Sequence, residues 1–139
     1  MKSIVIAVGA CLAIAVSGCS QVANTINSND PAGTAKNIAI CTATQQPLTL
    51  LSQQVDAAVT SETAKVAATK LTGLLTTLES ATGTATGQLA TTVTGLDTSV
   101  KAFITALSQG ASTAELTKLG NAVKAQITAY QTQCATYTQ

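Results

Sequence analysis

The sequence predicts an all-α protein, folded as an up-and-down antiparallel four-helix bundle that is stapled by one disulfide. Four segments carry apolar residues at spacings of three and four, which is the period of one helix face. The segments between them are short, and short connections favour antiparallel neighbours. Cys41 and Cys134 fall near the start of the first segment and in the last turns of the fourth. In an up-and-down bundle these two places lie side by side, so the cysteine positions agree with the topology.

The first helical segment, residues 35–59, is interrupted by a proline. Pro47 has no amide hydrogen, and its ring clashes with the carbonyl group four residues earlier. We therefore expect this helix to be kinked or broken at Pro47, with the proline beginning a second helical piece. The predicted apolar face of the segment comprises Ile38, Cys41, Gln45, Leu48, Leu51 and Val55.

The second helix is predicted to begin after Ser61, a suitable N-cap residue, and to reach about Ser80. Residues 81–87 then read as a connection, because two glycines and three threonines in seven residues oppose a helix. The apolar stripe of this second helix comprises Val66, Leu71, Leu74, Leu75 and Leu78.

The third and fourth helices are joined at a well-marked boundary. Gly110 suits the position that follows a helix C-terminus. Ser112 and Glu115 then have the order of a capping box ahead of an apolar run. The predicted stripes are Leu89, Val93, Leu96, Val100, Phe103 and Leu107 for the third helix, and Leu116, Leu119, Val123, Ile127, Tyr130, Cys134 and Tyr137 for the fourth.

A weak internal repeat accompanies these four segments. The pattern aliphatic-Thr-x-Leu-x-x-x-aliphatic starts at residues 48, 71, 93 and 116, which lie 23, 22 and 23 residues apart. It arises either by chance in a helical chain rich in Leu, Val and Thr, or from a repeated helical hairpin. Both explanations predict helices of similar length.

The N-terminus has three regions in the order of an export signal. A positive start at Lys2 is followed by an apolar run, residues 4–16, and then by small residues. The run is well short of the roughly 20 residues that cross a bilayer. Its end, Val16-Ser17-Gly18-Cys19, resembles the lipobox of bacterial lipoprotein precursors. The resemblance implies diacylglyceryl transfer to the Cys19 sulfur, cleavage after Gly18, and acylation of the new amine by a fatty acid such as palmitate.

This resemblance divides the chain into three parts: a signal peptide, residues 1–18, a lipidated flexible tether, residues 19–34, and the helical bundle domain, residues 35–139. The expected location is extracytoplasmic, with the protein held through Cys19 on the cell membrane or, in a diderm host, on the outer membrane. A plain secretory signal is the alternative.

Three cysteines follow the predicted cleavage site, and an odd number outside the cytoplasm normally leaves a free thiol. Lipidation of Cys19 would leave Cys41 and Cys134 as one pair. The alternative for this pair is redox chemistry, but no CxxC spacing and no neighbouring His or Arg favours it. We therefore predict a structural disulfide.

The composition excludes several functional classes. The chain has no His, which excludes Ser-His-Asp and Cys-His nucleophiles and imidazole metal sites. Without Lys2, six lysines oppose six carboxylates, so no net positive charge favours nucleic acid. Glu62–Lys65, Asp97–Lys101 and Glu115–Lys118 have the spacing of exposed ion pairs within helices. We expect no enzyme activity, no cofactor and no metal.

Three glycines, Gly73, Gly95 and Gly120, fall inside predicted helices. Small residues at helix crossings permit close contact, or leave a gap where a ligand could sit, and we favour close contact. The expected function is a membrane-anchored, non-catalytic binding or spacer module with a partner protein in the cell envelope. The alternatives are a carrier of an apolar small molecule or lipid between helices, and an inhibitor or exclusion factor that blocks an envelope receptor.

Overall fold

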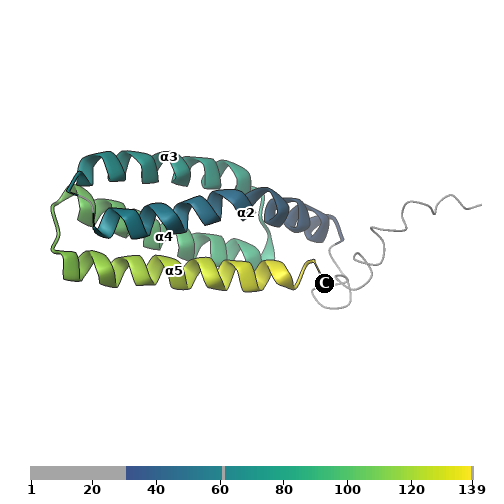
Figure 1. Ribbon diagram of the computed structural model, residues 1–139. Helices are drawn as coiled ribbons and strands as arrows, with labels where there is room; N and C mark the ends of the chain where they lie inside the picture. Colours follow the sequence, from purple (N-terminus) through teal and green to yellow (C-terminus); the bar gives the residue numbers. More distant parts are fainter. Residues whose placement is uncertain (1–30, 61, 139) are drawn as a thin grey trace, which may run out of the picture.

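The computed structural model describes residues 31–60 and 62–138, and this part of the chain contains four helices and no strand (Figure 1). They are α2 (Pro31–Val59), α3 (Ala64–Thr82), α4 (Gly87–Ser108) and α5 (Thr113–Ala135). Each helix packs against the next in the chain, and α2 also packs against α5, which closes the ring. The predicted all-α four-helix bundle is confirmed.

Helix α2 begins earlier than predicted. The tether was expected to reach Thr34, but the helix starts at Pro31, and both Gly33 and Thr34 are buried. Proline suits the first helical position because its φ angle is already helical and its missing amide hydrogen would have no partner there. The predicted boundary at residues 34 and 35 is therefore wrong, and the bundle includes Pro31. Residues 19–30 of the predicted tether lie outside the described residues.

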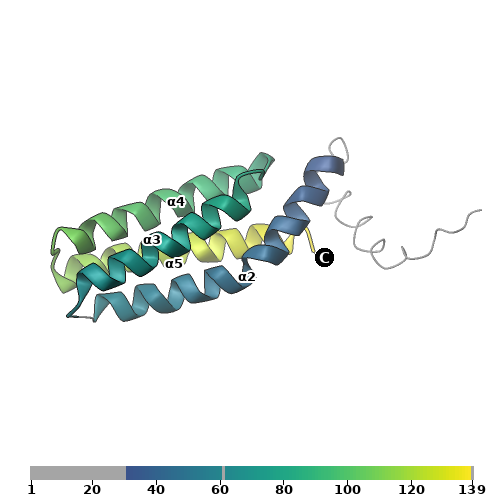
Figure 2. The same cartoon turned by 90° about the horizontal axis from the view of Figure 1, so that it is seen from above.

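Pro47 lies inside α2 and does not end it. The helix is continuous from Pro31 to Val59, and Figure 2 shows its dark-blue first part running at an angle to its teal second part. The expected kink is present and the alternative, a break into two helices, is not. A bend of this kind follows from the ring of a proline in a helix interior, which pushes away the carbonyl group one turn earlier.

The face that α2 turns to the core differs from the prediction at its first half. Gln45 is exposed and Ile38 is only half-buried, whereas Asn37, Ile40 and Thr44 are buried. Two of these three residues are polar, so apolar periodicity does not mark them as buried. It predicts instead a face shifted by one residue, to Ile38 and Gln45. The other predicted residues of this face are buried: Cys41, Leu48, Leu51 and Val55.

Helix α3 begins at Ala64, after Thr63, and not directly after the predicted cap. Ser61 itself lies outside the described residues. Val66 was predicted to face the core but is 54% exposed. Ala68, two residues later, is buried in its place. Leu74 is half-buried, and the rest of the predicted stripe is buried: Leu71, Leu75 and Leu78.

The junction of α4 and α5 follows the prediction closely. Gly110 has a φ of 72°, and the Ala111 amide donates to the Ala106 carbonyl at 3.0 Å, which is the Schellman arrangement. The Ser112 hydroxyl then accepts a hydrogen bond from the Glu115 amide at 3.3 Å. Of the two predicted stripes, Val93, Leu119 and Cys134 are half-buried and all other members are buried.

The centre of the bundle is packed around Gly120. A β-carbon at this position would lie 3.1 Å from Val55 Cγ1 of α2 and 3.5 Å from Phe103 Cε2 of α4. Close helix contact at Gly120 is therefore confirmed. Gly73 is different, since it is exposed and has open space around it. Gly95 is half-buried and faces a glutamine side chain of α5.

Substitutions at these two kinds of glycine should act in opposite directions. Gly120→Val places two methyl groups against Val55 and Phe103, and should lower the free energy of unfolding by about 1–3 kcal/mol. Gly73→Ala removes backbone freedom from the unfolded chain at a site with room, and should raise it by about 0.5–1 kcal/mol. Urea unfolding followed by circular dichroism measures both. Equal stability of the two variants would contradict the packing described here.

Candidate functional site

The predicted site residues fall in two groups. Cys19, the predicted lipidation site, lies outside the described residues. Cys41 and Cys134 form a disulfide with an S–S distance of 1.98 Å and a Cα–Cα distance of 5.5 Å. The predicted bridge is therefore confirmed, and it ties the first part of α2 to the last turns of α5. We call this end of the bundle, with the start of α2, the α3–α4 connection and the end of α5, the disulfide end.

A groove follows the seam between α2 and α5 from the disulfide towards the middle of the bundle. Its first part, about 380 Å³, includes both cysteines, and its second part, about 310 Å³, extends to Lys124. The two parts share Leu48, Thr49 and Gln131, so they form one continuous surface, which we call the α2/α5 groove. Its buried members are Cys41, Leu48, Ile127 and Tyr130, and its exposed members include Gln45, Thr49, Gln53, Thr128, Gln131 and Thr138.

A hydrogen bond beneath the groove joins the same two helices. Thr44 Oγ1 and the Tyr130 hydroxyl are 2.8 Å apart, and Thr44 also donates to the Ile40 carbonyl at 2.9 Å. Because that carbonyl takes the threonine proton, the Tyr130 hydroxyl donates to Thr44 Oγ1. Burial raises the pKa of Tyr130.

A second polar contact fixes the disulfide end. The Asn37 side-chain amide donates to the Thr86 carbonyl and accepts from the Thr86 amide, both at 3.1 Å. Thr86 precedes α4 in the α3–α4 connection. Asn37 therefore satisfies a backbone donor and acceptor that helix hydrogen bonds do not reach, and it ties α2 to this connection as the disulfide ties it to α5.

Two of the three ion pairs of the described residues join neighbouring helices. Lys101 of α4 binds Asp97 at 3.0 Å, as predicted, and also Glu79 of α3 at 2.9 Å. The hydrogen bonds to Glu79 and Asp97 raise the pKa of Lys101. Lys124 of α5 binds Asp56 of α2. The other predicted pairs, Glu62–Lys65 and Glu115–Lys118, are not formed in this part of the chain.

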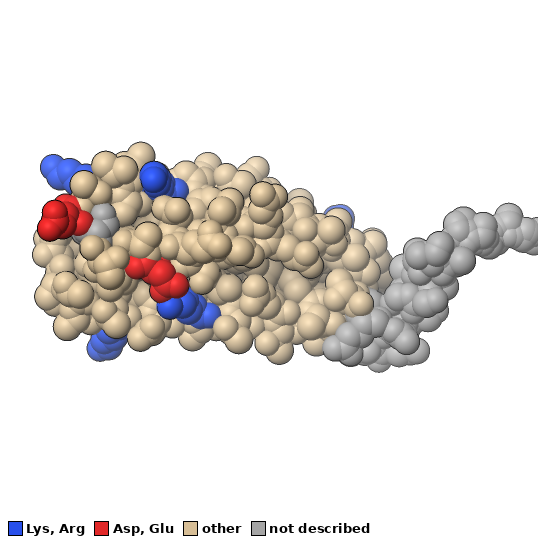
Figure 3. All heavy atoms as spheres, in the orientation of Figure 1, with Lys and Arg blue, Asp and Glu red and all other residues tan. Residues whose placement is uncertain are grey.

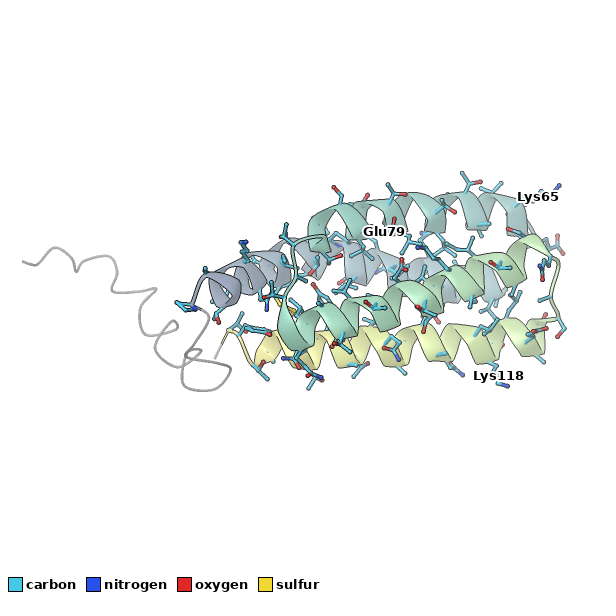
Figure 4. All side chains as sticks on the ribbon, turned by 180° about the vertical axis from the view of Figure 1, so that it is seen from behind. Lys65, Glu79 and Lys118 are labelled. Atoms are coloured by element: carbon cyan, nitrogen blue, oxygen red, sulfur yellow. A yellow bond between two sulfur atoms is a disulfide. The ribbon has the colours of Figure 1, made fainter. Side chains whose placement is uncertain are left out.

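Charged side chains gather away from the disulfide end. Figure 3 shows one face of the molecule, and most of the charged side chains on it lie over one half. The other half, next to the long grey segment, is almost entirely tan. In Figure 4, Lys65 and Lys118 point outward near the opposite end of the bundle and Glu79 lies farther along α3. The sequence agrees, because no charged residue occurs in 37–55, 80–96 or 125–138. The up-and-down topology brings parts of all three stretches to the disulfide end.

The described residues contain no group of three metal-binding side chains from His, Cys, Asp and Glu. The apolar hollow between α3 and α4, beside Leu75 and Leu96, holds only about 20 Å³. Small-molecule pockets are typically about 300–1,000 Å³. No helix within residues 31–60 and 62–138 combines the length and the apolar character needed to span a bilayer.

The α2/α5 groove was not predicted from the sequence, although the positions of the two cysteines indicate it. Once Cys41 and Cys134 are paired, the facing sides of the two helices are known. Residues one turn from each cysteine then border the seam, which would have indicated Gln45 and Tyr130. Helical periodicity alone favoured Gln45 as a core residue, when it is an exposed wall of the groove.

Comparison of the chain with protein-family models, with curated proteins and with solved structures found no match.

The disulfide should contribute strongly to stability. It joins residues 93 positions apart, and loop entropy predicts a contribution of about 4–5 kcal/mol for a loop of this size. We expect reduction, or Cys41→Ser with Cys134→Ser, to lower the melting temperature of residues 20–139 by more than about 10 °C. Thermal unfolding followed by circular dichroism measures this. As a control, the reductant should not shift the doubly substituted protein, and two free thiols in exported, denatured protein would refute the bridge.

Removing the Tyr130 hydroxyl should change both stability and its pH dependence. Tyr130→Phe loses a buried hydrogen bond, so the free energy of unfolding at neutral pH should fall by about 1 kcal/mol. Because the pKa of Tyr130 is raised from 10.0 in the folded state, the unfolded chain loses this proton first as the pH rises. The stability that this residue contributes is therefore present below about pH 10 and is lost above it. Urea unfolding at pH 7 and near pH 10.5 should show the gap between wild type and variant narrowing; a constant gap would contradict the assignment.

Proposed function

We propose that the protein is a lipid-anchored, non-catalytic binding module of the cell envelope. Cys19 carries the lipid, residues 20–30 form the link, and the bundle that begins at Pro31 is presented on the extracytoplasmic side of the membrane. The chemistry of the described surface supports binding over catalysis, because Lys101 and Lys124 are held in ion pairs between helices and the groove is lined mostly by uncharged side chains.

The disulfide is the observation that carries this proposal. Disulfides form and persist outside the cytoplasm, where an exported protein folds. Cys41 and Cys134 are used by the bridge, so of the three cysteines that follow Gly18, Cys19 alone is left for lipid attachment. The lipobox-like Val16-Ser17-Gly18-Cys19 then accounts for that cysteine by its place after an apolar run.

The position of the disulfide suits an anchored protein. The chain enters the described structure at Pro31, and the bridge holds α2 ten residues later, at Cys41. A covalent tie close to the entry point prevents a pull on the tether from peeling α2 away from the other helices. Asn37 strengthens the same region through its two hydrogen bonds to Thr86.

The packing inside the bundle gives less support to the alternative hypothesis, a carrier of an apolar small molecule or lipid. Val55 and Phe103 fill the space beside Gly120, and the apolar hollow between α3 and α4 is too small for a lipid chain. An inhibitor or exclusion factor would also be a binding module, and it differs only in what its partner does. Chemical crosslinking in intact cells separates these hypotheses, because a specific envelope protein supports a binding module or an inhibitor, while co-purifying lipid supports a carrier.

Loss of Cys19 should release the protein from the membrane. Cys19→Ala should give an uncleaved or unacylated precursor that salt and carbonate washes remove, whereas wild type should need detergent. Cys11→Ala is a matched control, since Cys11 lies inside the apolar run and should be replaceable without effect on anchoring. Fractionation with immunoblotting follows both variants. The proposal would be refuted if mass spectrometry found Cys19 intact and without lipid in wild-type protein.

A further inference from the structure

The α2/α5 groove presents amide groups that the bundle itself does not use. Gln45, Gln53 and Gln131 are exposed along it, and their side chains make no hydrogen bond within the described residues. A glutamine amide offers one acceptor oxygen and two donor hydrogens. Gln45 and Gln53 lie eight residues apart on one helix, a rise of about 12 Å. The free amides therefore follow the length of the groove.

Threonine hydroxyls in the same walls are turned into acceptors. Thr49 donates its proton to the Gln45 carbonyl and Thr128 donates to the Lys124 carbonyl, each at 3.0 Å. Their oxygen lone pairs are left to accept hydrogen bonds from outside. The wall thus offers donors from amides and acceptors from amides and hydroxyls.

The groove carries almost no charge. Lys124 alone among its lining residues is charged, and Asp56 neutralises it at the far end. A polyanion would find no cationic partner along the remaining length, and a cationic peptide would find no carboxylate. A wholly apolar ligand would cover the free amides and leave them without partners, which is unfavourable. The ligand that matches this lining is neutral and rich in hydroxyl groups.

We propose that the α2/α5 groove binds a neutral glycan strand. Sugar hydroxyls both donate and accept, so they match the amides of Gln45, Gln53 and Gln131 and the acceptor oxygens of Thr49 and Thr128. This inference rests on the proposed function, since it names the class of partner that the anchored module holds. The groove reaches Cys134 and Thr138, so the bound strand lies against the disulfide end of the bundle.

The test uses purified full-length lipidated protein in a polyoxyethylene detergent, because sugar-headed detergents would compete. Calorimetric titration with chitohexaose and with maltohexaose should show saturable binding of at least one, with a Kd below about 1 mM. Gln45→Ala with Gln131→Ala should weaken binding roughly tenfold, as expected for two lost hydrogen bonds. Gln46→Ala is the matched control, because Gln46 is an exposed glutamine of α2 outside the groove and should have no effect.

Binding should also be nearly independent of salt, since no ion pair forms, and Cys19→Ala should bind as wild type does. Failure of Cys19 to carry lipid would then overturn the anchoring while leaving glycan binding measurable. Absence of binding to both sugars, or equal binding by the doubly substituted protein, would overturn the glycan assignment. So would binding of a neutral Gly-Ser peptide in their place, or a dimer by light scattering that Gln45→Ala with Gln131→Ala dissociates.

Discussion

The bond between Cys41 and Cys134 is the constraint on which the bundle depends, because it joins the one pair of neighbouring helices that no loop connects. Loops hold α2 to α3, α3 to α4 and α4 to α5, whereas α2 and α5 meet through packing, the Thr44–Tyr130 hydrogen bond, the Lys124–Asp56 ion pair and this bridge. Aromatic residues are 2% of the chain, so the core rests on aliphatic side chains and on close approach at Gly120. With little apolar area to bury per residue, a covalent link between the first and last helices carries a large share of the stability.

Threonine is frequent in these helices, and its hydroxyl group determines the polarity of their surface. Thr72, Thr76 and Thr98, like many others, donate the hydroxyl proton to the carbonyl group four residues earlier, at 2.8–3.0 Å. This bond lets a β-branched polar residue occupy helix interiors that its propensity disfavours. It also fixes the hydroxyl oxygen with its lone pairs outward. The result is a surface that is polar with little charge, and the α2/α5 groove shares this property.

The fold could be predicted from the sequence where polarity and burial agree. In α4 and α5 nearly every buried position is apolar, and the turn between them is marked by Gly110 and Ser112, so both stripes and their boundary were predicted correctly. In α2 polarity and burial disagree, because the polar residues Asn37 and Thr44 are buried and bind partners from distant parts of the chain. Nothing in the local sequence reveals Thr86 or Tyr130 as those partners. The register was therefore shifted to Ile38 and Gln45, and Pro31 was taken for a turn when it begins the helix.

The groove is marked in the sequence only indirectly, through the pairing of Cys41 and Cys134. Its walls come from α2 and α5, which are separated in the chain by two other helices, and their exposed residues are mostly glutamine and threonine, which mark no site by themselves. Only the topology brings the three uncharged stretches together at one end, and only the disulfide determines which faces of α2 and α5 meet there. The chain enters the bundle at that same end, at Pro31. If Cys19 holds the lipid, the part of the groove beside the disulfide therefore lies on the side of the anchor, while Lys65 and Lys118 lie near the opposite end of the bundle (Figure 4). Such a module would hold a neutral strand close to the membrane and present most of its charged side chains farther from it.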